Sequence, residues 1–273
     1  MRGRLYLVGT PIGNLGDLTE RARETLAEVD LVAAEDTRRT GKLLAHLGIK
    51  ARMVSLFEGN ERERTERLLG ELRGGAQVAL VSDAGMPSVS DPGFRLVRAC
   101  AAEGIDVRVV PGPSAVTAAL AISGLPTDRW AFEGFLPRKV GERRARLRDL
   151  AGDSRTLVLF ESSRRLVATL RDVLNALGDR EVAVARELTK LHEEVVRGPV
   201  SQVLEALEGS EPRGEVVVVL GGAQATPPPF DALVDEAREL AAGGMRKREA
   251  AADVARRRGG SANAIYERLV GPG

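Results

Sequence analysis

The most constraining feature of the sequence is a short apolar run that passes directly into a loop rich in glycine, proline and aspartate. Residues 78–81 (VALV) are apolar without interruption, which is typical of a strand buried on both faces of a sheet. Residues 82–93 then hold two glycines, two prolines and two aspartates, and a helical period begins at Phe94. Ligands of open α/β sheets bind beyond the carboxyl ends of the strands, so this unit predicts a site where Gly85 lets a ligand approach the backbone. A turn without a ligand is the alternative.

The same order of strand, loop and helix recurs through the first 122 residues. Alternating strands and helices predict an α/β domain with a mostly parallel sheet and right-handed crossovers. The glycines after the first strand, at positions 9, 13 and 16, lack the spacing of a dinucleotide-binding loop. The predicted strands are 5–8, 31–34, 53–57, 78–81 and 106–110, and the predicted helices are 20–29, 42–47, 58–72, 94–103 and 115–122.

After a predicted boundary at residues 123–128 the helices become fewer for each strand. Residues 123–222 are therefore predicted to form a second α/β domain with a mixed sheet, built on strands at 130–135, 156–160, 182–186 and 215–220 and a helix at 166–177. Three prolines within residues 223–230 predict a stiff linker. Helices at 232–242, 247–257 and 261–269, separated by glycine pairs, predict a small all-helical module over residues 231–273 with a helix-turn-helix arrangement.

Composition narrows the class of protein without naming a partner. With 43% hydrophobic and 29% charged residues and a net charge of +1, the chain is expected to be an ordinary soluble globular protein. Cys100, the only cysteine, excludes an intramolecular disulfide and is expected in the core. No apolar run is long enough for a signal peptide or a membrane span, so we expect a cytoplasmic location. The two histidines, His46 and His192, are too far apart in the sequence to suggest a metal site.

Two segments are strongly basic in this nearly neutral chain. Residues 136–148 carry six basic side chains against the single acid Glu142, and residues 246–258 carry six against Glu249 and Asp253. Such segments predict contact with a polyanion. The alternatives are a solvated helix face for the first segment and a helical appendage that only packs for the second.

Six loop motifs follow one another along the chain, namely residues 8–14 (VGTPIGN), 34–39 (AEDTRR), 81–93 (VSDAGMPSVSDPG), 110–115 (VPGPSA), 124–129 (GLPTDR) and 132–137 (FEGFLP). This ordered series closely resembles the ribosomal RNA small subunit methyltransferase I family, which has the tetrapyrrole-methylase fold. The resemblance covers residues 4–222 and, more weakly, the helical tail. Tetrapyrrole methylases usually carry Gly-Gly-Asp-Pro after the central strand, whereas this chain has DAGMP at 83–87, which argues against a porphyrin substrate. Trp130 stands where the family is expected to have phenylalanine.

The resemblance implies a two-domain tetrapyrrole-methylase-like α/β fold, with domains at 1–122 and 123–222 and S-adenosylmethionine in the cleft between them. It implies 2′-O-methylation of a cytidine ribose, with 16S ribosomal RNA or the small ribosomal subunit as partner, no DNA, no membrane, and a homodimer by analogy. A precorrin- or uroporphyrinogen-type tetrapyrrole methyltransferase and a non-catalytic RNA-binding protein are the alternatives. The implied cofactor-binding residues are Pro11, Ser82, Asp83, Ala84, Gly85, Met86, Ser88, Val89, Ser114, Ala115, Phe160, Glu161, Leu188, Gly214 and Glu215.

Methyl transfer to a hydroxyl needs help at the acceptor, since a hydroxyl is a poor nucleophile until its proton leaves. We expect a nearby base, or a cation that stabilises the developing alkoxide. Asp83, Glu35 and Lys190 are the catalytic candidates, and Asp83 is favoured because it follows the central strand. The candidates for RNA binding are Arg38, Arg39, Arg138, Lys139, Arg143, Arg144, Arg246, Lys247, Arg248, Arg256, Arg257 and Arg258.

Overall fold

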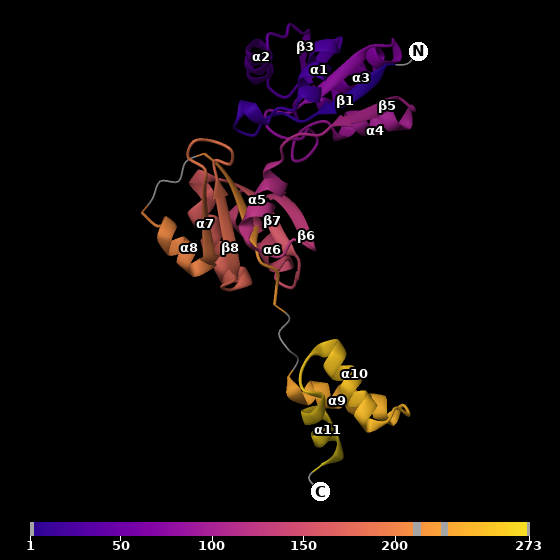
Figure 1. Cartoon of the computed structure of the whole chain (residues 1–273), viewed down its shortest axis with the longest axis vertical. Coiled ribbons are helices and arrows are strands. Elements are labelled where there is room, and N and C mark those ends of the chain that lie inside the picture. The colour runs from indigo at the N-terminus through magenta and orange to yellow at the C-terminus, as the bar shows by residue number, and fades with distance from the viewer. Residues whose placement is uncertain (1–2, 210–213, 225–228, 272–273) are drawn as a thin grey trace. The chain divides into compact units, whose positions relative to one another are not determined.

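The computed structural model describes residues 3–209, 214–224 and 229–271, and the chain divides into two compact units at 1–223 and 224–273. The first unit holds two five-stranded sheets (Figure 1). They correspond to the two predicted α/β domains, although the structure packs both into one unit. The division into separate domains at residue 122 therefore stays a prediction.

The first sheet has the strand order β3-β2-β4-β1-β5, and every neighbouring pair is parallel. β4 lies at its centre with residues 78–81 buried, which confirms the strand predicted to be central. Helices connect successive strands, as parallel pairing requires. The strands are β1 (Arg4–Val8), β2 (Leu31–Ala34), β3 (Met53–Ser55), β4 (Gln77–Val81) and β5 (Asp106–Val110).

The helices of the first half follow the prediction except at two starts, one of which is that of α3, at Glu61 rather than at residue 58. Thr19 caps α1, accepting a hydrogen bond from the Ala22 N–H at 3.2 Å, as its sequence position predicts. The next helix begins at Thr37 rather than Lys42, because the Asp36 carboxylate caps it by accepting the Arg38 N–H at 2.8 Å. Cys100 is fully buried, which confirms its place in the core. The helices are the 3₁₀ turn η1 (Leu15–Asp17), α1 (Glu20–Glu28), α2 (Thr37–His46), α3 (Glu61–Arg73), α4 (Phe94–Ala102) and α5 (Ala115–Ser123).

The second sheet has the order β6-β7-β10-β8-β9, with β6 and β7 parallel and the other pairs antiparallel, so the predicted mixed sheet is confirmed. Sequence analysis missed β9 and α8. The spacing of Val200, Val203, Leu204 and Leu207, all buried on one side of α8, is the helical signal that was available. The elements are β6 (Trp130–Phe135), α6 (Val140–Asp149), β7 (Thr156–Ser162), α7 (Ser163–Leu177), β8 (Glu181–Arg186), β9 (Glu194–Pro199), α8 (Val200–Leu207) and β10 (Glu215–Leu220).

The second unit is a bundle of three helices, α9 (Phe230–Ala242), α10 (Lys247–Arg258) and α11 (Ala262–Val270), which confirms the three predicted helices. Leu233, Val254 and Ile265 meet in its small core. Part of the predicted proline linker, residues 225–228, lies outside the described residues. Over the stretches that the structure describes, no helix is both long and apolar enough to cross a membrane.

Candidate functional site

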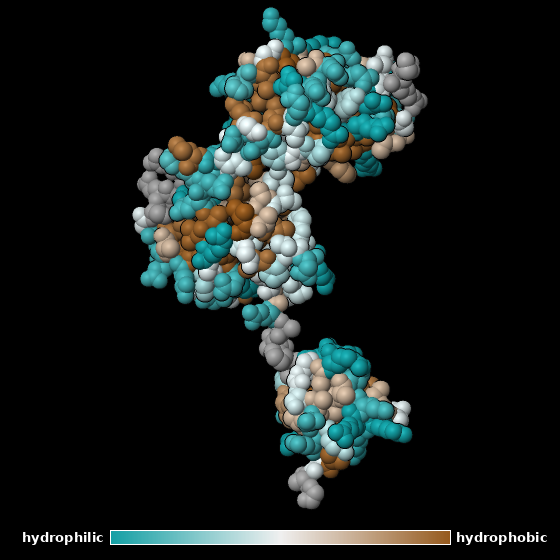
Figure 2. Space-filling model, viewed as in Figure 1, coloured by the Kyte–Doolittle hydropathy of each residue, from teal (hydrophilic) through white to brown (hydrophobic). Residues whose placement is uncertain are grey.

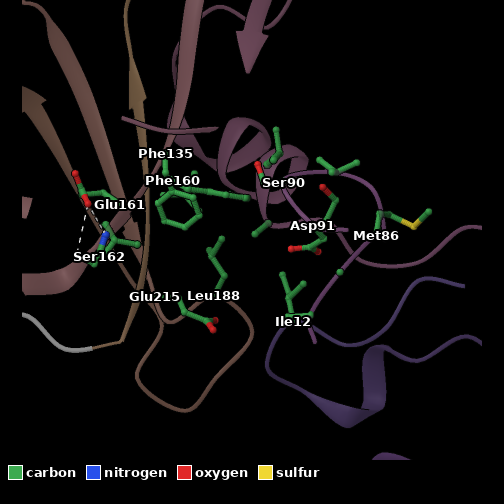
Figure 3. A pocket seen from close by; sticks show the side chains of 18 of the residues that line it. Ile12, Met86, Ser90, Asp91, Phe135, Phe160, Glu161, Ser162, Leu188 and Glu215 are labelled. Atoms are coloured by element: carbon green, nitrogen blue, oxygen red, sulfur yellow. Dashed lines mark hydrogen bonds between the residues drawn. The ribbon is translucent and has the colours of Figure 1, made fainter. Parts of the chain in front are cut away.

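A cavity of about 330 Å³ lies between the loops of the first sheet and one face of the second. Figure 3 shows Ser90, Asp91 and Met86 on one side of it and Phe160 and Glu161 on the other. Its volume falls within the range of small-molecule sites. The first sheet contributes the carboxyl ends of its strands, where a ligand was predicted. The lining residues are Ile12, Ala84, Gly85, Met86, Val89, Ser90, Asp91, Ser114, Ala115, Val116, Phe135, Phe160, Glu161, Ser162, Leu188, Gly214, Glu215, Val216 and Val217.

The loop after β4 forms the first wall through an unusual backbone. Gly85 has φ +83°, a conformation that disfavours side chains, and it exchanges two hydrogen bonds with Thr10 in the loop after β1. The Gly85 N–H donates to the Thr10 carbonyl at 3.1 Å, and the Thr10 N–H donates back at 2.9 Å. Ser88 and Ser90 also have positive φ, at 69° and 62°. Strained backbone of this kind concentrates at functional sites.

A close approach of two glycines brings the start of α5 to the cavity. A Cβ on Gly9 would lie 2.6 Å from the Gly112 nitrogen, so neither position has room for a side chain. The loops after β1 and β5 therefore touch through their backbones. This contact sets Ser114 and Ala115 at the cavity wall. Ser114 is the N-cap residue of α5 as predicted, although its side chain makes no capping hydrogen bond.

Aromatic rings and the loop after β8 build the opposite wall. The Phe160 ring packs edge-on against Phe132, with centroids 4.9 Å apart, and lies 5.5 Å from the ring of Phe135. Leu188 comes from the loop, in which Glu187 and Thr189 both have positive φ. These side chains give the wall a largely apolar surface.

Lys190 fastens this loop to β10. Its ammonium lies 3.0 Å from Glu187 and 3.2 Å from Glu215, and Glu187 also accepts the Glu215 N–H at 3.1 Å. Burial alone would lower the pKa of Lys190, but the hydrogen bonds to the two glutamates outweigh it and raise the pKa. Lys190 therefore stays protonated near neutral pH, which disfavours it as the catalytic base.

The other two catalytic candidates lie side by side at the ends of neighbouring strands. The Glu35 carboxylate accepts the Asp83 N–H at 3.2 Å, and the Asp83 carboxylate accepts the Asp36 N–H at 3.0 Å. Arg39 lies 3.4 Å from Asp83. Burial raises the pKa of both Glu35 and Asp83. Neither side chain lines the cavity, but Ala84 does, so Asp83 stands at the cavity margin, toward Arg39.

Sequence analysis missed Asp91, an acid of the loop after β4 that does line the cavity. Asp91 is half-buried, and burial followed by the negative charge of Glu35 raises its pKa to about 7. Its position in the same loop as Asp83 was the available signal. The other lining residues that were not predicted are Ile12, Ser90, Val116, Phe135, Ser162, Val216 and Val217.

Most of the predicted cofactor-binding residues do line the cavity. The structure sets four apart from it, namely Pro11, Ser82, Asp83 and Ser88. Ser82 is buried, and its hydroxyl is directed at the backbone carbonyls of its own loop. Over the described part of the chain, no group of three histidine, cysteine, aspartate or glutamate side chains is arranged to hold a metal.

The basic residues of the first unit that were predicted to bind RNA differ in their exposure and in their ion pairs. Arg38 and Arg39 are exposed in the first turn of α2, with Arg38 paired to Asp36 and Arg39 to Asp83. Arg138 and Lys139 come just before α6 and are exposed. Arg143 is buried against Asp172, so its guanidinium is not available to RNA, and we withdraw it from the candidates.

The ion pair of Arg143 with Asp172 predicts a stability effect. Their side chains are 6% and 3% exposed and lie 2.6 Å apart. Asp172→Ala would leave a buried arginine without its partner and should destabilise the fold by about 3 kcal/mol, measured by urea unfolding. Arg144 is the matched control, because it reaches the same carboxylate from a 55% exposed position. Arg144→Ala should cost less than about 1 kcal/mol, and equal losses in the two variants would contradict this account.

In the second unit the six basic candidates are all exposed and belong to or precede α10. Arg256 and Arg257 pair with Asp253, and Arg257 and Arg258 with Glu236. At the other end of the helix Arg246 and Lys247 have no ion pair among the residues that the structure describes, and Arg248 stacks over Tyr266 at 5.9 Å. Hydrophilic residues cover much of the visible face of this unit (Figure 2). Among the six candidates of the second unit, those at the start of α10 are therefore the least engaged by acidic side chains.

Comparisons with known proteins agree on one family. The family model of the tetrapyrrole (corrin/porphyrin) methylases matches residues 4–204. A protein of Thermotoga maritima named ribosomal RNA small subunit methyltransferase I is 54% identical over 81% of this chain and 99% of its own length. One of the same name from Synechocystis is 49% identical over 93% and 92%. A uroporphyrin-III C-methyl transferase of Thermus thermophilus, solved with S-adenyl homocysteine, is 28% identical with a TM-score of 0.57, over 80% of this chain and 97% of that one.

Proposed function

The chain belongs to the ribosomal RNA small subunit methyltransferase I family, within the tetrapyrrole methylases, and on that premise we propose that it methylates a cytidine 2′-hydroxyl of 16S ribosomal RNA. It is an S-adenosylmethionine-dependent methyltransferase. The observation that carries the proposal is the cavity between the two sheets, built from the loops that carry the family motifs. Because the proposed substrate is ribosomal RNA, we also propose a cytoplasmic location.

The residues of the cavity fit the methyl donor. Gly85 has no side chain and presents its backbone to the cavity, while Phe160 and Leu188 offer the apolar surface that an adenine ring needs. When bound, S-adenosylmethionine supplies a methyl group on a positively charged sulfur. The chain itself mainly aligns donor and acceptor, and such alignment reaches effective molarities of about 10⁵–10⁸ M.

We assign proton removal from the acceptor hydroxyl to Asp83. Its carboxylate stands between the cavity margin at Ala84 and the exposed guanidinium of Arg39, which can hold a phosphate of the same RNA. The raised pKa of Asp83 makes it a stronger base than an ordinary aspartate. Glu35 supports it by accepting its backbone N–H.

The acceptor is proposed to be RNA rather than a tetrapyrrole for two reasons. The relatives named as ribosomal RNA methyltransferases are about twice as similar in sequence as the uroporphyrin methyltransferase. Exposed arginines at the cavity margin and the basic start of α10 also suit a polyanion better than a porphyrin.

Removing residues 224–273 should weaken RNA binding while leaving S-adenosylmethionine affinity unchanged, because the cavity lies wholly in the first unit. Each lost phosphate contact should lower the slope of log affinity against log salt by about 0.7–0.9. Filter binding across a salt series checks this. Replacing Arg246, Lys247 and Arg248 by alanine should reproduce much of the loss, whereas Arg238→Ala should not, since Arg238 pairs with Asp235. RNA affinity and slope that survive truncation would exclude the second unit from docking.

We also propose a homodimer, because symmetric pairs are the commonest assembly of soluble proteins. Phe94 and Val109 expose apolar surface on the first half, at 66% and 54%. Light scattering should give twice the 29.2 kDa of one chain. A mass that stays at one chain as concentration rises would refute the dimer.

A further inference from the structure

One carboxyl group of the cavity has no positive partner within residues 3–209, 214–224 and 229–271. Three acidic side chains line the cavity. Glu161 lies 3.4 Å from Arg165, and Glu215 lies 3.2 Å from Lys190. Asp91, the third, makes no ion pair with any residue that the structure describes. Its charge is therefore left for a ligand to match.

The charged groups near Asp91 also favour a positively charged ligand beside it. The negative charges of Glu35 and Asp83, at the ends of β2 and β4, act on Asp91, and Arg39, the cation beside them, is already engaged by Asp83. Burial comes first among the causes that raise the pKa of Asp91 to about 7, followed by the charge of Glu35, while the nearby Ser82 hydroxyl acts to lower it. Near neutral pH the carboxyl is thus only partly ionised. A cation placed beside it would complete the ionisation.

We propose that Asp91 is the counter-charge for the sulfonium of S-adenosylmethionine and the residue by which the site distinguishes the methyl donor from its demethylated product. This inference rests on the proposed function. The donor carries a positive sulfur, whereas S-adenosylhomocysteine has a neutral thioether in its place. A carboxylate in a partly buried cavity attracts the first and gains little from the second. The attraction is lost when the methyl group leaves, which favours release of the product.

The sign of the pH effect follows from this linkage. Below pH 7 most of the free protein has Asp91 protonated, so binding the donor must expel a proton. The affinity for the donor therefore decreases as the pH is lowered. An opposite charge lowers a carboxyl pKa by about 1–3 units, so donor affinity should weaken about five- to tenfold between pH 8 and pH 6. Affinity for S-adenosylhomocysteine should change by less than about twofold. Glu161 and Glu215 are already paired with cations and should not reproduce this difference.

Titration calorimetry on the full chain tests the inference. Both ligands are titrated between pH 6 and pH 8 in two buffers of different ionisation enthalpy, which measures proton release directly. We expect release near pH 6.5 with S-adenosylmethionine and none with S-adenosylhomocysteine. Asp91→Asn should lower donor affinity about tenfold at pH 8, the equivalent of one pKa unit, abolish the release, and leave product affinity within about twofold. Asp17→Asn is the control, because it removes one negative charge from the same half of the unit outside the cavity.

The possible outcomes distinguish a failure of the counter-charge role of Asp91 from a failure of the proposed function. If Asp91→Asn lowered the affinity for both ligands equally, the counter-charge role would be overturned, because shape or a hydrogen bond would then account for the effect of the residue. Equal pH dependence of the two ligands in the unaltered protein would overturn it without any variant, so a folding defect of Asp91→Asn cannot hide the answer. If the unaltered protein bound neither ligand, the proposed function itself would fail.

Discussion

Replacing Asp83 by asparagine should lower kcat about 10²–10⁴-fold while leaving the affinity for S-adenosylmethionine nearly unchanged. Asparagine keeps the shape and can still accept the Asp36 N–H, but it cannot take a proton. The expected loss is the usual share of general base catalysis, with proximity supplying the rest. Single-turnover methylation of RNA measures the rate, and calorimetry measures the affinity.

The pH profile gives a second check on Asp83. The base acts only when ionised, so the rate should fall as pH drops through its raised pKa, and that acid limb should vanish in Asp83→Asn. Asp106→Asn is the control, since Asp106 is a paired carboxylate at the opposite end of the same sheet. Loss of cofactor binding in Asp83→Asn would make Asp83 a binding residue and turn the search for the base to Glu35.

Gly85→Val should weaken S-adenosylmethionine binding at least about a hundredfold. At φ +83° a β-branched residue is strained, and its Cβ would already contact Ile12 at 3.4 Å and the Pro113 carbonyl at 3.5 Å. The methyl groups beyond it must enter the cavity or displace the loop. Calorimetry gives the affinity and circular dichroism shows that the fold survives.

A matched variant separates backbone strain from the loss of space. Gly48 has a similar φ of +70° and ends the turn after α2. A Cβ added there would have no other atom within 4 Å, so Gly48→Val carries the strain without touching the cavity. It should bind the cofactor as the unaltered protein does. Undiminished binding in Gly85→Val would place the cofactor elsewhere.

The sequence predicted elements whose signal is local. The apolar run at 78–81 specified the central strand, and the turn residues after it specified a loop at the ligand end of the sheet. Gly85 could be singled out because a glycine among prolines indicates an unusual backbone, and its φ confirms that. The proposed cofactor-binding residues came from the family resemblance rather than from any single pattern.

The features that could not be predicted from the sequence depend on contacts between segments far apart in the chain. Nothing near Arg143 shows that Asp172 lies opposite it, so a buried arginine resembled an exposed one. Asp91 resembled a turn residue, and only the cavity shows that it is an acid without a cation among the described residues. Asp36, in the motif at 34–39, illustrates a third limit, because a polar residue after a strand can cap the next helix, as Asp36 does, or can belong to a site.

Methyl transfer to 16S RNA tests the central claim most directly. The full chain is incubated with S-adenosylmethionine labelled in the methyl group and with either free 16S RNA or small ribosomal subunits lacking the modification, and the RNA is digested and mapped by mass. The proposal predicts label in a single 2′-O-methylcytidine whose 3′ linkage resists alkali, because the 2′-hydroxyl that alkaline cleavage requires is blocked. Label at an alkali-sensitive nucleotide, or no label in either RNA while a tetrapyrrole accepts the methyl group, would contradict it.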